Sequence, residues 1–273
     1  MILVPHQDDE ILMAAGLIYE LRQRDLPLSV VMATNGDYEC KDHSKGEARL
    51  RESLAGLHLL GVPEEDFIIL GYADTGMEAE VSFLTGLLHE SDEYRVHPSA
   101  CGCETYSLPG HDEWHRQVFG EHGPYHRKGF VSDLKSLLET KLPNRIFTTA
   151  PFDLHGDHDA LFCFLEEVLK ELSVEKGYEP QVYCGVIHSC AGDDVWPPRE
   201  MARFSCPKGL WEKMRFSWED RYILELPEEL SPKAGSENLK YRALCMHETA
   251  LEPDAVDFLM AFIKEEELFW RMQ

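Results

Sequence analysis

The chain begins Met1-Ile-Leu-Val-Pro-His-Gln-Asp-Asp-Glu10, so four apolar residues are followed almost directly by an imidazole and three carboxylates. The apolar run predicts a buried strand, and the helical spacing of apolar residues from Ile11 to Leu21 predicts an amphipathic helix after it. Because like charges repel, a fold that gathers these carboxylates beside a buried strand is expected to hold a cation there. The alternative is a solvated acidic helix N-terminus, which the helix dipole also favours.

Strand-like runs alternate with helical patterns along the rest of the chain. The predicted strands cover residues 29–33, 67–70, 145–150, 181–188 and about 222–226, and the predicted helices cover about 45–60, 130–138 and 161–172, with two more near the C-terminus. This alternation predicts an α/β fold, Rossmann-like, with three α/β/α layers and a mostly parallel central sheet. Ligands of such sheets bind at the carboxyl ends of the strands. Gly16, in mid-helix, indicates that its helix packs closely on the sheet.

A second polar motif follows the predicted strand 145–150. It reads Pro151-Phe-Asp-Leu-His-Gly-Asp-His158 and leads into another amphipathic helix, as the first motif does. If the two strands are neighbours, the motifs converge and can offer two imidazoles and one carboxylate to one metal. That set suits zinc with one position left open for water. The alternative is that His155 and His158 are helix-capping or solvated residues.

The two motifs resemble the signatures of a known family. Pro5-His-Gln-Asp-Asp-Glu10 resembles the PHPDDE motif, and His155-Gly-Asp-His158 the HPDH motif, of the PIG-L (LmbE-like) zinc-dependent de-N-acetylases. Arg49-Leu-Arg-Glu52 and Leu70-Gly-Tyr-Ala-Asp74 are similar to two further motifs of that family, and the region from Leu244 to Phe269 is similar to its C-terminal helices. Gln7 and Gly156 stand where the family usually has proline, and we expect each to loosen its turn.

The resemblance implies a metal-dependent hydrolase. Zinc, or another divalent transition metal, would be held by His6, Asp9 and His158, and Asp8 would act as the general base toward a metal-activated water. The implied reaction removes an N-acetyl group from an N-acetylglucosamine-type amino sugar or glycoconjugate. Two alternatives stay open, namely a zinc amidase of the same fold that cuts a non-sugar or thiol-conjugate amide, and a non-enzymatic module that binds metal or sugar. A dinucleotide enzyme is disfavoured because no G-x-G-x-x-G follows the first strand.

The resemblance also implies supporting roles for four residues. A protonated His155 would stabilise the oxyanion, and Asp157 would orient an imidazole. Arg49 and Asp74 would bind substrate hydroxyls. Without the family, an arginine on a helix more often covers a surface, and an aspartate at a strand end is often a turn residue.

Between about residues 90 and 129 the periodicity disappears, although the segment carries five histidines. We predict an insertion that acts as a lid or substrate loop, with Tyr125 or His126 near the pocket. The stretch His111-Asp-Glu-Trp-His115 lacks the glutamate that directly follows the first histidine in a protease zinc helix. We predict a single domain over residues 1–273, with this insertion and a C-terminal extension from about residue 193.

The amino-acid composition limits the classes of molecule that the protein is expected to bind. The 50 Asp and Glu residues against 26 Lys and Arg residues give a net charge of −24, which would repel nucleic acid. The longest strongly apolar run, Ile11 to Tyr19, falls well short of the roughly 18 residues of a membrane span, and no secretory signal is visible. A small-molecule or glycan substrate is expected, and a homo-oligomer is compatible with the sequence. The eight cysteines are scattered, and the Cys101-Gly-Cys103 pair lacks zinc-knuckle spacing, so a reducing, cytoplasmic setting fits best.

Overall fold

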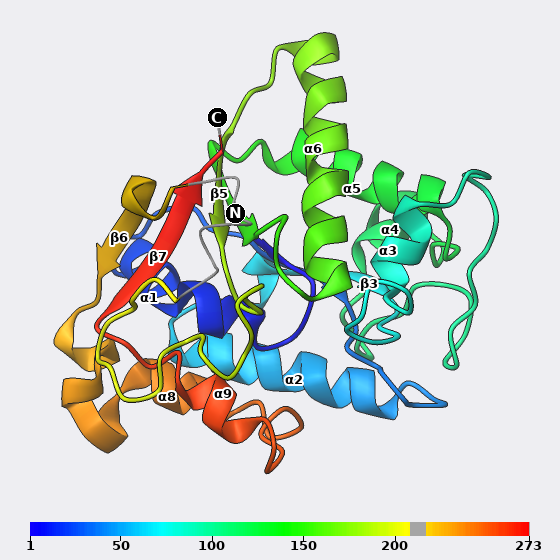
Figure 1. Ribbon diagram of the computed structural model, residues 1–273. Coiled ribbons are helices and arrows are strands. Elements are labelled where there is room, and N and C mark those ends of the chain that lie inside the picture. The colour runs from blue at the N-terminus through cyan, green and yellow to red at the C-terminus, as the bar shows by residue number, and fades with distance from the viewer. Residues whose placement is uncertain (208–216, 273) are drawn as a thin grey trace.

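The amino-terminal strand lies near the middle of a mixed sheet. The computed structural model describes residues 1–207 and 217–272, and within them seven strands have the order β3-β2-β1-β4-β5-β7-β6 (Figure 1). The strands are β1 Ile2–Val4, β2 Val30–Thr34, β3 Phe67–Tyr72, β4 Arg145–Thr149, β5 Gln181–Gly185, β6 Arg221–Glu225 and β7 Glu266–Arg271. Strands β1 to β5 are parallel, whereas β7 is antiparallel to β5 and β6. The predicted α/β fold with a mostly parallel sheet is confirmed.

Helices cover both faces of the sheet. Because successive residues of a strand point to opposite faces, one strand contributes to the packing on both sides. Ile2 and Val4 pack in one buried cluster with α1, α2, α8 and α9, whereas Leu3 packs in another with α3, α4, α5 and α6 (Figure 1). The helices are α1 Asp9–Gln23, α2 Ser44–Leu59, α3 Phe83–Leu88, α4 Trp114–Phe119, α5 Arg127–Lys141, α6 Gly156–Lys176, α8 Leu239–Leu244 and α9 Val256–Met260. Short 3-10 turns are η1 Glu64–Asp66, η2 Trp218–Asp220, η3 Glu228–Leu230 and η4 Pro232–Glu237. The predicted three layers are present.

Helix α1 is kinked where it packs closely on the sheet. Ala14 has non-helical dihedral angles, with φ −140° and ψ 16°. Two residues later, a Cβ on Gly16 would lie 2.0 Å from Cδ2 of Leu226, which follows β6. The N–H of Gly16 donates to the side chain of Glu267 in β7 at 2.8 Å. The close packing predicted from this glycine is confirmed, because a larger side chain would collide with the sheet.

The C-terminal region departs from the prediction. Helices were expected as far as Phe269, but α8 and α9 are short and the chain then forms strand β7. Glu266 and Glu267 are buried in this strand, where they pair with Arg203 at 2.6 Å and Lys240 at 2.9 Å. The prediction was wrong because two adjacent glutamates look solvated in the sequence, and a strand can bury them only with cationic partners that are remote along the chain.

Histidines fasten the insertion to the rest of the fold. Two histidine–carboxylate pairs join this segment to other elements, His111–Glu64 at 3.2 Å and His115–Asp133 at 2.7 Å. Two further pairs lie within it, His97–Glu90 at 3.0 Å and His122–Glu113 at 2.8 Å. The segment also contains α4, whose Trp114 is buried in the core. Two of its histidines therefore attach the insertion to the fold, and two others stabilise it internally.

Tyr125 and His126 do not lie at the pocket. Tyr125 is fully buried in the core, against Tyr72 and Phe83. His126 caps α5, since its Nδ1 accepts a hydrogen bond from the N–H of Gly129 at 2.7 Å. Neither residue lines the cavity described below, and both serve the packing of the insertion.

All eight cysteines lie in the part of the chain that the structure describes. None of its cysteines is joined to another, and Cys101 and Cys103 belong to no candidate metal-binding group there. None of the helices in residues 1–207 and 217–272 is long and apolar enough to cross a membrane.

Candidate metal centre and active site

The carboxyl ends of β1 and β4 bring the two polar motifs together. The two strands are paired neighbours, with Leu3 opposite Thr148. Residues 5–8 connect β1 to α1, and residues 150–155 connect β4 to α6, so both helices begin beside the same sheet edge (Figure 1). The convergence expected for neighbouring strands is present in the structure.

Three side-chain ligand atoms from the two motifs form a nearly equilateral triangle. His6 Nδ1 lies 3.3 Å from His158 Nε2 and 3.4 Å from Asp9 Oδ2. His158 Nε2 lies 3.3 Å from the same oxygen of Asp9. Tetrahedral zinc with bonds of about 2.0–2.1 Å to N and O separates its ligand atoms by roughly 3.3–3.4 Å. The triangle has the size of one face of that tetrahedron, and its donor atoms are ones that zinc accepts.

His155 offers a further nitrogen at the same place. One ligand atom from each of His6, His155 and His158 lies within 4.8 Å of the others. However, Nδ1 of His155 accepts the backbone N–H of Asp157 at 3.2 Å, so a neutral ring carries its proton on Nε2 and is a donor there. Burial and the charges of neighbouring imidazoles, His6 first, lower the pKa of His155. These surroundings oppose the protonated His155 predicted from the sequence and favour a neutral donor.

A buried carboxylate faces the other nitrogen of each imidazole in the triangle. Asp157 Oδ2 lies 3.1 Å from His6 Nε2, and Asp153 Oδ2 lies 3.2 Å from His158 Nδ1. Such carboxylates fix the tautomer and the ring orientation of histidines that bind metals. Asp153 was not singled out from the sequence. Its oxygens also accept backbone N–H groups of residues 187–188 at 2.9 and 3.0 Å, and those partners lie more than 30 positions away.

The surroundings of the triangle favour positive charge. Burial lowers the pKa of His6, but the hydrogen bond to Asp157 and the charges of Asp74 and Asp9 outweigh it and raise the pKa to about 10. Burial is likewise outweighed at His158, whose pKa is raised by neighbouring carboxylates. A proton or a metal ion can supply that charge, so the electrostatics as well as the distances fit a cation centre.

Asp8 stands outside the triangle. It is the N-cap of α1 with φ 104°, a conformation that non-glycine residues rarely adopt, and its N–H donates to Oε2 of Glu10 at 3.0 Å. Its Oδ2 lies 3.6 Å from Nη2 of Arg49. Burial raises the pKa of Asp8 to about 7, although the guanidinium of Arg49 opposes this. A carboxyl group with a pKa near neutrality is suited to take up and return a proton.

Arg49 and Asp74 flank the centre. Arg49, in α2, donates from Nη2 to the carbonyl of Gln7 at 2.8 Å, which ties it to the first motif. Asp74 lies beyond β3, with Oδ2 4.0 Å from Nε2 of His6. Both residues therefore lie beside the triangle, and the substrate-binding role that the family resemblance implies for them stays a prediction.

A cavity of 260 Å³ opens beside Asp74. Its lining residues are Asp37, Tyr38, Glu39, Cys40, Asp74, Thr75, Ser99, Ala100 and Cys101. The last three belong to the insertion, so this segment contributes one wall of the cavity, as expected of a substrate loop. The lining includes three carboxylates and neither lysine nor arginine, which makes the cavity acidic.

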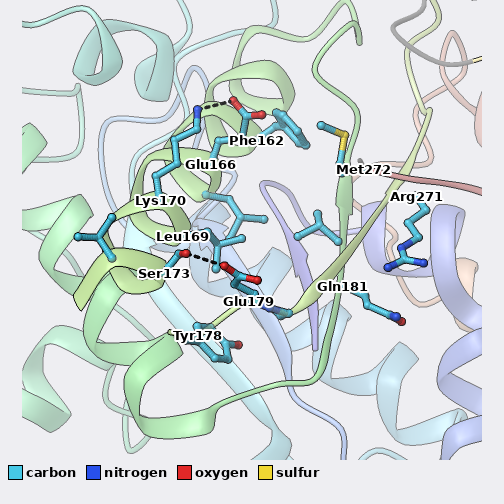
Figure 2. A pocket seen from close by; sticks show the side chains of 14 residues that line it. Phe162, Glu166, Leu169, Lys170, Ser173, Tyr178, Glu179, Gln181, Arg271 and Met272 are labelled. Carbon is cyan, nitrogen blue, oxygen red and sulfur yellow. Dashed lines mark hydrogen bonds and ion pairs between the residues drawn. The ribbon is translucent and has the colours of Figure 1, made fainter. Parts of the chain in front are cut away.

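A larger cleft lies elsewhere. Its volume is 630 Å³, and it is formed by α6 from Phe162 onward, the start of β5 and the end of β7 (Figure 2). Glu166 bonds with Lys170 at 3.4 Å and Ser173 with Glu179 at 2.8 Å, so these polar side chains satisfy one another. Because none of the predicted site residues lines it and it is at the amino end of β5, we assign no chemistry to it.

The fold and the centre define an α/β protein with an imidazole–carboxylate metal-type site at the carboxyl ends of its parallel strands. A family model named PIG-L and described as GlcNAc-PI de-N-acetylase matches residues 1–169. The chain belongs to this family. Among curated proteins, none matches the chain.

Solved structures share the fold at low sequence identity. The N,N'-diacetylchitobiose deacetylase from Pyrococcus horikoshii is 16% identical, with TM-score 0.55 over 99% of this chain and 82% of that one. The teicoplanin deacetylase Orf2, in a zinc-inhibited form, is 15% identical, with TM-score 0.53 over 99% and 96%. The 4-carboxy-2-hydroxymuconate hydratase GalB from Pseudomonas putida is 10% identical, with TM-score 0.50 over 100% and 95%. One fold thus carries different reactions, and function must be argued from the site.

Proposed function

We propose that the protein is a zinc-dependent hydrolase that removes the N-acetyl group from an N-acetylglucosamine-type amino sugar or glycoconjugate. The observation that carries the proposal is the zinc-sized triangle of His6, Asp9 and His158 with a separate carboxylate, Asp8, beside it. A site that only bound metal would have no use for a strained, buried carboxylate next to its ligands. Membership of the PIG-L family and the fold shared with sugar deacetylases agree with this reading.

In the proposed reaction the chain's own groups hold and move protons. The metal, when bound, supplies Lewis acidity, which lowers the pKa of water and polarises the acetamide carbonyl. Asp8 accepts a proton from the attacking water and later delivers it to the leaving amine, while Arg49 limits where its carboxylate can turn. The Nε2–H of His155 donates a hydrogen bond to the carbonyl oxygen as negative charge develops there.

The substrate would lie between the triangle and the acidic cavity. A cavity of 260 Å³ has room for about one sugar ring, and Asp74 at its edge is placed to accept sugar hydroxyls. Because three carboxylates line it without a lysine or arginine, an uncharged saccharide is a better occupant than a phosphorylated one. We therefore propose a neutral amino sugar or oligosaccharide as the substrate class.

The proposal treats residues 1–273 as one domain. It is supported by the sheet, which joins β1 at the start of the chain to β7 at its end through β4 and β5. A cytoplasmic setting and a homo-oligomer stay predictions from the sequence.

The central experiment measures amine release from N-acetylglucosamine, N,N'-diacetylchitobiose, N-acetylated amino acids and thiol-conjugate amides. We expect the zinc-loaded protein to act on the sugars, to lose activity on chelation and to regain it with zinc. Asp8→Asn should lower kcat by about 10²- to 10⁴-fold, since it removes the proton acceptor. The matched control is Asp112→Asn, which changes an exposed carboxylate that pairs with Arg116, and it should leave kcat unchanged.

Two outcomes would overturn this proposal. Turnover confined to the non-sugar amides would assign the protein to the amidase alternative. No turnover on any substrate, with sugar or zinc still bound by both the wild-type protein and Asp8→Asn, would identify a non-enzymatic binding module.

A further inference from the structure

A fourth imidazole lies beside the centre and has no part in the mechanism above. His188 follows β5, and its ring centroid lies 5.6 Å from that of His158 and 5.8 Å from that of His155. Its backbone N–H donates to Asp153 at 3.0 Å, the same carboxylate that faces His158. The neighbouring strands β4 and β5 thus place the residue at the edge of the site, outside the segment that the family model matches.

The ring of His188 is held in one orientation. Its Nδ1 lies 2.9 Å from Oδ2 of Asp193, and its plane stacks on Phe258 at 4.9 Å and 13°. Arg199 donates to the carbonyl of Asp193 at 2.7 Å and lies over the ring of Phe258, at 5.6 Å from its centroid. Residues from the C-terminal extension therefore fix a side chain of the sheet edge.

This orientation leaves Nε2 as a hydrogen-bond acceptor. A carboxylate can only accept, so the contact with Asp193 keeps the proton of a neutral ring on Nδ1. Within residues 1–207 and 217–272, no protein group is hydrogen-bonded to Nε2 of His188, whose side chain is 19% exposed. The other ring nitrogens of the site face a carboxylate, a backbone N–H or the triangle, whereas Nε2 of His188 lies on the side of the ring away from Asp193.

A merely structural role is the competing explanation, because histidine–carboxylate pairs also stabilise the insertion. His97 forms such a pair, with Nε2 3.0 Å from Oε2 of Glu90. His188 differs, since its ring borders two histidines of the site and its outer nitrogen is unused. The position and the orientation of the ring therefore indicate that Nε2 of His188 binds a ligand.

We propose that His188 is a substrate-binding residue, whose Nε2 accepts a hydrogen bond from a hydroxyl of the amino sugar, and that Asp193 is its positioning residue. The inference rests on the deacetylase function proposed above. A neutral imidazole nitrogen recognises a hydroxyl donor, so the bond selects a saccharide with a free hydroxyl near the acetamide over an amide that has none.

The test pairs protein variants with deoxy substrates. His188→Ala should raise KM for the methyl glycoside of N-acetylglucosamine roughly fivefold to tenfold with little change in kcat, as the bond exists before and during reaction. His188→Gln, which keeps an acceptor, should recover part of the loss, and Asp193→Ala should reproduce His188→Ala. One of the 3-, 4- and 6-deoxy glycosides should be poor for the wild-type protein and no worse for His188→Ala. His97→Ala is the matched control and should behave as the wild type.

The possible results distinguish a failure of this inference from a failure of the proposed function. No turnover of any glycoside by the wild-type protein would overturn the proposed function, and this inference with it. Turnover by the wild type, with His188→Ala weakened by one factor on every deoxy glycoside or not weakened at all, would overturn the inference alone. Circular dichroism and zinc content of each variant identify a loss that comes from misfolding, and for a misfolded alanine variant His188→Gln takes its place in the same comparison.

Discussion

At the scale of single residues, Gly156 shows how a departure from the family motif is accommodated. It stands where the family usually has proline, and its turn is not loosened. Its N–H donates to the carbonyl of Met77 at 2.7 Å, and a Cβ at this position would lie 2.6 Å from Cβ of Ser82. That close approach lets the hydroxyl of Ser82 donate to Asp157, the carboxylate behind His6. The motif's residue types were readable from the sequence, whereas this contact depends on a segment about 75 positions away.

Restoring the family's proline at this position is therefore expected to harm the site. Gly156→Pro removes the N–H that bonds to Met77 and pushes ring atoms into Ser82, so Asp157 loses its place and zinc affinity falls. We expect at least a roughly tenfold loss of zinc affinity, measured by competition with a chromophoric chelator. Gly86→Ala is the control, because its new Cβ would meet only His97, at 3.7 Å. Wild-type zinc binding by Gly156→Pro would contradict this account of the turn.

Asp153 gives a second test at this scale. Asp153→Asn keeps the size of the side chain but removes the negative charge that faces His158 at 3.2 Å. Because such carboxylates typically contribute 10- to 100-fold to metal affinity, we expect zinc binding to weaken by about that factor. Asp254→Asn, at an exposed position, should leave it unchanged. If both variants bind zinc equally, Asp153 serves only the backbone N–H groups that it accepts, those of His155 and of residues 187–188.

At the scale of elements, the strands and the long helices before residue 190 follow their patterns, whereas the short helices α3 and α4 and the strand β7 were not predicted. Runs such as 67–70 are apolar and bounded by turn residues, so local sequence suffices to predict them. In β7, Glu267 accepts the N–H groups of Gly16 and Leu17 at the kink of α1, at 2.8 and 3.1 Å. Lys240 from α8 completes the arrangement with a bond of 2.9 Å to Glu267. The buried charge of β7 is balanced by groups from α1 and α8. Because these helices are remote along the chain, the local sequence does not predict this strand.

The buried pair should dominate the stability of this region. Lys240→Met leaves Glu267 charged and buried, and removing one partner of a buried ion pair costs about 3–5 kcal/mol. Urea unfolding of the two proteins measures the difference. The control is Lys176→Met, since Lys176 pairs with Glu139 at 2.8 Å on the surface and should lose less than about 1 kcal/mol. Equal stabilities of the wild-type protein and Lys240→Met would show that the N–H groups of α1 alone are enough to stabilise the buried Glu267.

At the scale of the whole molecule, the parallel strands present the centre at one sheet edge, and two irregular regions flank it. The insertion supplies Ser99 to Cys101 as a cavity wall, and the C-terminal extension supplies Asp193 and Phe258 around His188. The sequence predicted the first as a substrate loop from its lost periodicity. It did not predict the second, because the pairing of His188 with Asp193 and Phe258 arises only when β5 and α9 are packed.

The attachment of the insertion should depend on pH. His115 bonds to Asp133, which also accepts the hydroxyl of Tyr72 in β3 at 2.7 Å. Burial lowers the pKa of His115, but the hydrogen bond to Asp133 and nearby negative charges outweigh it, so the pKa lies above the usual 6.5. A raised pKa means that the attachment is fully present below pH 6.5 and weakens as the pH rises through the folded-state value.

Hydrogen exchange, corrected for intrinsic rates, should therefore show residues 103–125 less protected at about pH 9 than at about pH 6. Strand β4 is the internal reference and should not change, and His115→Gln should reduce the difference because glutamine does not titrate. An equal loss of protection in β4 would show that the whole fold, and not the insertion, responds to pH.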